Sequence, residues 1–365
     1  MPKSVVYLLG SGATHAVVNH LDGSKGLLTS HVRGVISKKE GSLRDSVFPK
    51  NIWNELIDDR VDIEHLISIT EANYNYKVTN DLRNEYSKAI SELSKGIAAN
   101  GTSDNLYSIL FDLYRVKGFS EKVSCVLTLN YEDILEESIK NHLDQGLDYV
   151  IEDLGSGPSK KNIPVLKLHG SFNWKNVRPV EVDKMDNVIG NSDALWIPPG
   201  VEKKKEKYPF NLLWGRAFEF LLDCDVLRII GCSLSRNDWD LIPLIYTTSK
   251  FNSKGKTFDI EIIDYPDQCD KIISQYQYLK IRHIFDINEV SAFLLKEYFP
   301  HLTDKKLKSI PDDLKEELAN NINPDRYNIF AMWLQAVGES LRENGVDLNT
   351  PKNIFNNFIV NGLRA

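Results

Sequence analysis

The sequence predicts an α/β protein built on a parallel β-sheet. Short apolar runs rich in β-branched residues, each bounded by small or polar residues, occur at residues 4–9, 123–127, 163–168, 226–230 and 258–263. Helix-like sequence follows several of these runs, and this strand–helix alternation is typical of a parallel sheet. The runs end in glycine-rich or polar turns, which is where open α/β sheets bind their ligands.

The composition indicates a folded globular protein. The chain has 365 residues, of which 42% are hydrophobic and 26% charged, enough for one large core or two modest ones. Its net charge of −7 argues against nucleic acid as the main ligand. We therefore expect no direct nucleic-acid partner. No stretch approaches the roughly 20 apolar residues that span a membrane, so we also expect no membrane partner.

The four cysteines, Cys125, Cys224, Cys232 and Cys269, lie far apart without a C-x-x-C pair. This spacing indicates neither a zinc site nor a disulfide framework, so we expect no metal. Because isolated thiols persist where disulfides do not form, we expect a cytoplasmic protein.

The first apolar run leads into a turn of small residues and a helix start. This turn consists of Gly10, Ser11, Gly12, Ala13 and Thr14. Small residues before a helix let backbone N–H groups face a phosphate. The full G-x-G-x-x-G pattern is not met, so an ordinary strand-to-helix turn remains the alternative.

Residues 51–117 show helical spacing, and we expect a helical insertion at about residues 40–120. Apolar positions recur at helical intervals at Leu82, Tyr86, Ala89, Ile90 and Leu93, and again at Leu106, Ile109, Leu110, Leu113 and Tyr114. For the segment 62–65 we leave two alternatives open. It either places a carboxylate or an imidazole over the ligand-binding cleft at the strand ends, or it is a solvated helix start.

Two polar residues follow the next two strands. Asn130 ends the run at 123–127 and precedes a helical stretch that reaches about His142, and its amide can hold a ribose hydroxyl and a water or cap the turn. His169 ends the run at 163–168, and the adjoining Gly170 lets backbone approach closely. A titratable imidazole there can act on a ligand or be structural.

The later strands end in similar signals. Gly231, Cys232 and Ser233 form a second small-residue turn, followed by Asp238, and Asp264 ends the last strand. An acidic group at a strand end can accept from a ribose hydroxyl, although a turn aspartate before proline is the alternative. We also expect a short hairpin arm at 173–174, a rigid loop at 191–200 and an amphipathic helix at 210–222.

We expect one domain at residues 1–290 and a C-terminal helical extension at 291–365. The pattern beyond about residue 288 is helical and carries no titratable cluster. Packing or oligomerisation is the role that we expect for this extension.

Four motifs in order resemble the sirtuin family: G-S-G-A-T at 10–14, T-L-N-Y-E at 128–132, K-L-H-G-S at 167–171 and G-C-S-L at 231–234. The resemblance spans about residues 4–265 and implies a Rossmann-like sheet that binds NAD. It is greatest to zinc-free bacterial sirtuin-like proteins of anti-phage defence, which consume NAD. The chain departs from the deacylases in lacking their four-cysteine zinc module and their G-I-P-x-F-R stretch, and in having Glu132 at an aspartate position.

The resemblance implies an NAD glycohydrolase that releases nicotinamide and ADP-ribose. Asn130 and His169 are the expected catalytic residues. The expected NAD-binding residues are Gly10, Ser11, Gly12, Ala13, Thr14, Tyr131, Gly231, Cys232, Ser233, Asp238 and Asp264. An NAD or ADP-ribose sensor, an ADP-ribose cyclase and a zinc-free deacylase are the alternatives. We expect a homo-oligomer, gated by a partner such as an ATPase, a helicase or an Argonaute-type sensor.

Overall fold

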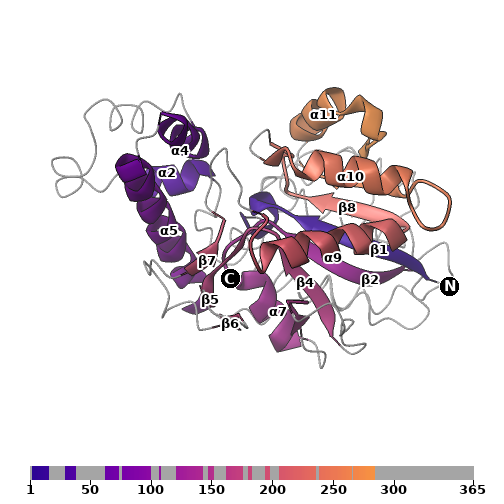
Figure 1. The fold of residues 1–365 in the computed structure, drawn as a ribbon, viewed down its shortest axis with the longest axis horizontal. Coiled ribbons are helices and arrows are strands. Elements are labelled where there is room, and N and C mark those ends of the chain that lie inside the picture. Colours follow the sequence, from indigo (N-terminus) through magenta and orange to yellow (C-terminus); the bar gives the residue numbers. More distant parts are fainter. Residues whose placement is uncertain are drawn as a thin grey trace, which may run out of the picture.

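The central element is a parallel sheet of seven strands in the order β10-β9-β8-β1-β2-β4-β3 (Figure 1). The computed structural model describes residues 2–15, 29–37, 62–73, 76–99, 107, 121–142, 147–151, 162–175, 180–182, 194–197, 205–235, 238–264 and 266–283. The strands are β1 (Lys3–Leu9), β2 (Glu121–Thr128), β3 (Leu147–Asp148), β4 (Ile163–Lys167), β8 (Val226–Ile230), β9 (Asp259–Ile263) and β10 (Arg282–His283). Every neighbouring pair runs parallel, which confirms the predicted α/β class.

The core strands are buried on both faces. All residues of β4 and β8, and the last five of β1, are buried. Strands that are covered on both faces consist of nearly continuous apolar residues, and this is why they could be predicted from the sequence. The expected strand at 163–168 ends at Lys167 in the structure.

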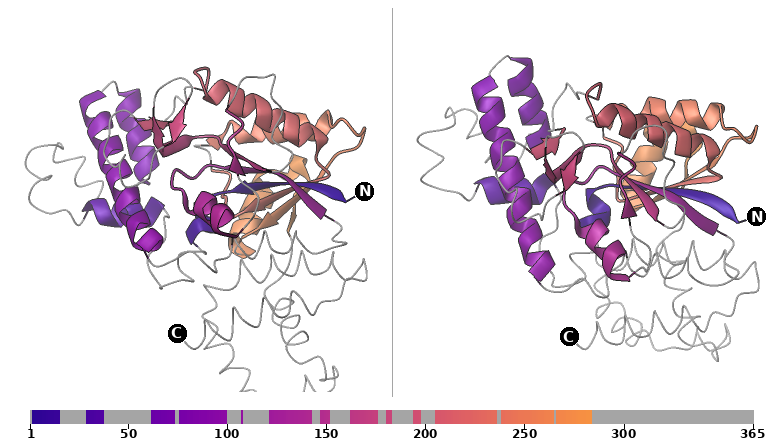
Figure 2. Two further views of the ribbon diagram at one scale, coloured as in Figure 1. Left: turned by 90° about the horizontal axis from the view of Figure 1, so that it is seen from below. Right: turned by 60° about the horizontal axis from the view of Figure 1, so that its bottom comes forward.

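Helices cover the two faces of the sheet. On one face, α9 (Phe210–Asp223) and α10 (Leu241–Lys250) bury apolar side chains against alternate residues of the strands, such as Val6, Leu8 and Leu227. The amphipathic helix expected at 210–222 is thereby confirmed. On the other face lies α7 (Ile134–His142) (Figure 2). The helix α11 (Pro266–Gln275) and the short 3₁₀ helix η2 (Gln277–Leu279) lie between β9 and β10 in the chain.

Three helices form a group beside the sheet: α2 (Thr29–Ser37), α4 (Ile63–Ala72) and α5 (Tyr76–Ala99) (Figure 1). The helix expected around residues 82–93 is confirmed as part of α5. Asp62 caps α4 by accepting the N–H of Glu64 at 2.8 Å, so this segment is a helix start. Except for Tyr107, the second helical run at 106–114 lies outside the described residues.

A small antiparallel sheet follows β4. Its strands are β5 (Gly170–Lys175), β6 (Glu181–Val182) and β7 (Ala194–Trp196), in the order β6-β5-β7. The hairpin expected at 173–174 is confirmed, because Trp174 pairs with Val182. The expected loop at 191–200 was too simple a reading, since β7 lies within it.

The expected C-terminal extension at 291–365 lies outside the described residues, so its helices and the boundary at 290 stay predictions. Within the part of the chain that the structure describes, no helix has the length and apolar character needed to cross a membrane.

Candidate functional site

The carboxyl ends of four adjacent strands meet at one edge of the sheet. In the register, Leu9 pairs with Ile230 on one side and with Thr128 on the other, and Thr128 pairs with Lys167. The turns that follow β8, β1, β2 and β4 therefore start in one row. After β1 the chain first forms the strands on one side of it (β2, β3 and β4) and later those on the other side (β8, β9 and β10). The strand order therefore reverses between β1 and β8, and open α/β sheets bind ligands at such a topological switch point.

The two glycine turns at this switch point touch through their backbones. Gly10 N–H donates to the carbonyl of Ile230 at 3.0 Å, and Gly12 N–H donates to Gly231 at 2.9 Å. A Cβ on Gly231 would lie 2.1 Å from the nitrogen of Ala13, and the φ of +56° at Gly231 is a conformation that favours glycine. The glycines are thus required by the contact between the two turns themselves.

Asn130 fastens the first glycine turn to the end of β2. Its Nδ2 donates to the carbonyl of Gly10 at 3.1 Å and to Oγ1 of Thr14 at 2.8 Å. These two bonds use both hydrogens of the amide nitrogen. The acceptor Oδ1 is therefore the part of the amide that is suited to a ligand hydroxyl or a water.

His169 lies at the end of β4 and is 5% exposed. Its Nε2 lies 3.7 Å from Oδ1 of Asp238, which follows the second glycine turn. The imidazole thus points toward the β8 side of the edge. The carbonyl of His169 accepts from the N–H of Ile197 at 2.8 Å, which links the residue to the small sheet.

Tyr131 forms an aromatic wall beside His169. The two rings are nearly parallel with centroids 6.2 Å apart, and Phe172 stacks on Tyr131 at 5.1 Å. Trp196 contacts Tyr131 edge-on, and the Tyr131 hydroxyl donates to the carbonyl of Ile197 at 2.9 Å. Tyr131 is therefore held by the residues around β5 and β7.

The remaining predicted residues lie at the same edge but differ in exposure. Ser11 is half-buried, Ala13 and Cys232 are buried, and Ser233 is exposed. Asp264 is buried directly after β9, where the carbonyl of Ile263 accepts from the N–H of Gly231 at 3.1 Å. The strand ends thus bring the predicted set to one region, while its contacts with a ligand stay predictions.

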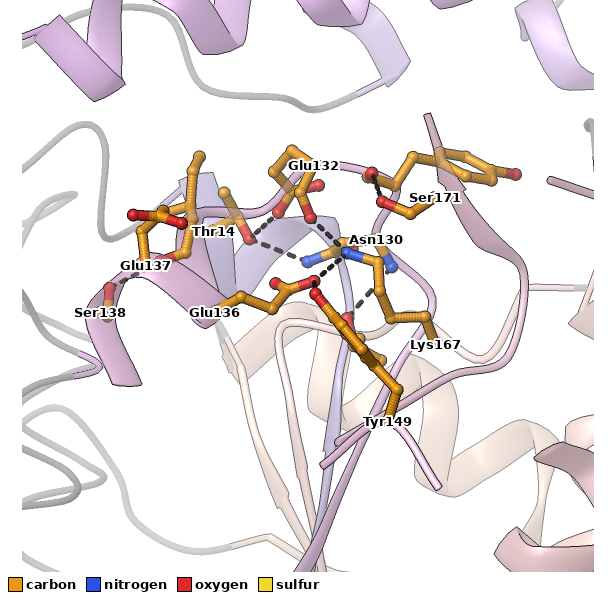
Figure 3. Close-up of polar contacts among 12 residues, drawn as sticks. Thr14, Asn130, Glu132, Glu136, Glu137, Ser138, Tyr149, Lys167 and Ser171 are labelled. Carbon is orange, nitrogen blue, oxygen red and sulfur yellow. Dashed lines mark hydrogen bonds and ion pairs between the residues drawn. The ribbon is translucent and has the colours of Figure 1, made fainter. Parts of the chain in front are cut away.

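A buried polar network beneath Asn130 was not predicted (Figure 3). Thr14 donates its hydroxyl hydrogen to Oε1 of Glu132 at 2.7 Å, so the hydroxyl of Tyr107, 2.9 Å from Thr14, acts as a donor. Lys167 donates to the backbone carbonyl of Glu132 and, at 2.7 Å, to Oε1 of Glu136. The signal in the sequence was a lysine inside an apolar strand. A buried lysine needs an acidic partner, because an unpaired buried charge is costly.

The network holds more acid than base. Burial raises the pKa of Glu132, although the charge of Lys167 and the hydrogen bond from Thr14 oppose the rise. Burial, together with the neighbouring charge of Glu136, raises the pKa of Asp133 to about 6. One carboxylate oxygen of Glu136 is buried without a hydrogen-bond partner.

Metal ligands do not gather among the described residues, where no group of three or more histidine, cysteine or acidic side chains could hold an ion. The four cysteines are buried and free of disulfides.

Residues 124–276 match a protein family described as SIR2-like domain. The matched segment contains three of the four motifs on which the sirtuin resemblance rests, namely those at 128–132, 167–171 and 231–234. The first glycine turn lies before it. A comparison with curated proteins finds no match.

Several solved structures of Sir2 proteins are similar to this chain. One, described under the mechanism and regulation of Sir2 enzymes, is 16% identical, with 74% of this chain and 85% of that chain covered and a TM-score of 0.36. A Sir2 protein bound to a propionylated peptide is 14% identical, with 81% and 93% covered and a TM-score of 0.37. A Sir2 homologue in complex with NAD is 14% identical, with 76% and 90% covered and a TM-score of 0.35.

Proposed function

We propose that this chain, through the segment that matches a SIR2-like domain, binds NAD at the carboxyl edge of the sheet and hydrolyses its nicotinamide N-glycosidic bond. The products are nicotinamide and ADP-ribose. NAD is a substrate in this proposal, and no metal takes part.

The observation that carries the proposal is the single row of strand ends at β8, β1, β2 and β4. It brings the first glycine turn, which suits a pyrophosphate, and the second, which suits the adenosine side, beside an amide and an imidazole, which suit a ribose and its attacking water. In this proposal residues 10–14 hold the pyrophosphate, and Gly231, Ser233 and Asp264 line the adenosine side. Asn130 and His169 face the nicotinamide ribose.

The reaction needs little acid catalysis. Nicotinamide is attached as a cation and leaves as a neutral molecule with the electron pair of the broken bond, so the sugar passes through an oxocarbenium-like state. Water then forms the new bond to the sugar carbon. Asn130 Oδ1 orients the water, and His169 takes its proton and passes it to solvent, while the adjacent Asp238 stabilises the imidazolium.

Two features favour water over an acyl-lysine peptide as the acceptor. The sequence has no cysteine between Cys125 and Cys224, so the segment after His169 cannot form a four-cysteine zinc module. Tyr131 is packed between His169 and the aromatic residues of β5 and β7, and in this proposal its ring occupies space beside the imidazole.

The experiment is nicotinamide release from NAD by the purified chain, with and without candidate activators, and by the variant His169→Ala. Loss of a general base is typically worth about 10²- to 10⁴-fold, so we expect the variant to lose activity in that range and keep its fold. His65→Ala is the matched control, because His65 is exposed on α4. Release by His169→Ala at the rate of the unaltered protein would contradict the assignment.

The products separate the alternatives. A cyclic ADP-ribose of distinct mass would indicate a cyclase, and release that requires an acyl-lysine peptide would indicate a deacylase. Thermal stabilisation by NAD without nicotinamide release would indicate a sensor.

The proposal extends to anti-phage defence, with the chain as an NAD-depleting effector. Unrestrained NAD loss is toxic, so activity would be gated by homo-oligomerisation or by an ATPase, helicase or Argonaute-type partner. Size-exclusion chromatography with and without the neighbouring gene product, combined with the nicotinamide assay, tests this. A monomer that is fully active and indifferent to any partner would contradict gating.

A further inference from the structure

Lys167 is the cation on which the geometry beneath Asn130 depends. It is the last residue of β4, and its ammonium is fully buried together with the carboxylate of Glu136. A buried ammonium contributes charge as well as hydrogen bonds. Lys167 contributes both, since it pairs with Glu136 on α7 and donates to the backbone carbonyl of Glu132.

The hydrogen bond to the Glu132 carbonyl restrains the turn that contains Asn130. Glu132 lies two residues after Asn130, and its side chain accepts from Thr14, which in turn accepts from Asn130. The chain of contacts therefore runs from Lys167 through Glu132 and Thr14 to the amide of Asn130 (Figure 3). It joins the ends of three strands, namely β4, β2 and β1.

We infer that Lys167 is a positioning residue that fixes the orientation of the Asn130 amide in the proposed NAD site. This inference rests on the proposed function for its kinetic consequence. With Lys167 in place, both Nδ2 hydrogens of Asn130 are bound by Gly10 and Thr14, so the amide, and with it Oδ1, keeps one orientation. Without it, the turn at 131–132 is released and the amide can rotate.

The obvious variant, Lys167→Met, leaves Glu136 buried without a cation and risks unfolding for that reason alone. The double variant Lys167→Met/Glu136→Met removes both charges and replaces them with side chains of similar volume. It therefore leaves no unpaired charge at position 136, but it does not replace the hydrogen bond to the Glu132 carbonyl. A purely structural role for Lys167 predicts that the double variant regains activity, whereas a positioning role predicts that it does not.

The matched control is Arg228→Lys. Arg228 is another buried cation on this face of the sheet, and its guanidinium donates to Glu121, Glu261 and Tyr7, none of which is a proposed site residue. We expect it to lower stability and leave the kcat of nicotinamide release unchanged.

The experiment measures two quantities for the unaltered protein, the double variant and the control. The first is the kcat and KM of nicotinamide release. The second is the hydrogen-exchange protection of the Asn130 side-chain amide, followed by NMR on protein labelled with ¹⁵N at asparagine side chains. Because misplacement of a catalytic group by about 1 Å can cost roughly 10²-fold, we expect kcat of the double variant to fall about 10- to 100-fold with KM changed less than about threefold. We also expect the Asn130 amide to lose its protection.

Retention of kcat by the double variant, or retention of the Asn130 protection, would overturn the inference. If the unaltered protein releases no nicotinamide, the proposed function fails. The exchange measurement then still decides whether Lys167 fixes the amide.

Discussion

Two buried cations lie on the same face of one parallel sheet, and their surroundings differ in charge balance. Arg228 shares a row with Tyr7, and Lys167 shares the row two residues further on with Leu9 and Thr128. Arg228 binds both oxygens of Glu121 at 3.0 Å and Oε2 of Glu261 at 2.9 Å. It also donates to the Tyr7 hydroxyl at 2.8 Å.

The Arg228 cluster is balanced at its buried carboxylates, because Glu121 and Glu261 meet two cations, Arg228 and the exposed Arg282, which donates to the other oxygen of Glu261 at 3.1 Å. Arg282 also pairs with the exposed Asp259 at 3.3 Å. The Lys167 cluster opposes one cation to the carboxyl groups of Glu132, Asp133 and Glu136. A balanced buried network serves the stability of the sheet. The unbalanced network lies at the strand ends where we propose that NAD binds. Its excess of buried carboxyl groups lowers the stability of the folded state, as is common at functional sites.

The largest expected effect is on the balanced cluster. Arg228→Met leaves Glu121 and Glu261 as buried carboxylates without their main cation, and such losses cost about 3–5 kcal/mol of the free energy of unfolding. Urea unfolding followed by circular dichroism measures this. A loss below about 1 kcal/mol would show that the cluster is not the stabilising network that its geometry indicates.

A smaller effect of opposite sign is expected in the unbalanced cluster. The pKa of Asp133 in the folded protein is about 6, whereas an unfolded aspartate loses its proton near pH 4. The folded state therefore binds more protons between these values, and stability falls as the pH rises from about 4 to 6. Asp133→Asn removes this penalty.

We expect Asp133→Asn to raise the free energy of unfolding by about 1–2 kcal/mol at pH 7.5, after allowance for partial solvent screening, and by much less at pH 4. Asparagine keeps the ability to begin α7, so the change is one of charge alone. Glu121→Gln is the paired variant in the balanced cluster, and we expect it to lower stability at pH 7.5. Urea unfolding at the two pH values measures both, and the same sign for both variants would refute the contrast.

The sequence predicted the parts of this edge that are local. The apolar runs located five of the strands, and Asn130, His169 and the two glycine turns were placed at their ends. The resemblance of four short motifs to the sirtuin family then suggested that these residues bind one ligand, NAD.

The contacts between distant segments could not be predicted. Nothing in the pattern of one strand shows that Lys167 pairs with Glu136, because that pairing depends on how α7 packs on the face of the sheet opposite α9. The glycines of the two turns read as ligand-binding signals, and only the register between β1 and β8 reveals that each turn excludes a Cβ on the other. Charged residues inside apolar runs, at Lys167 and Arg228, indicate that partners exist but not which ones.

The central claim is that four strand ends form one site for NAD. Backbone hydrogen exchange of His169→Ala, a variant expected to bind NAD without consuming it quickly, tests this most directly. We predict that NAD slows exchange together at residues 10–14, 128–131, 168–170 and 231–233, and leaves unchanged the last turn of α9 at 219–223, which lies toward the amino ends of the strands. Protection confined to one of these segments, or absent from all of them, would contradict the claim.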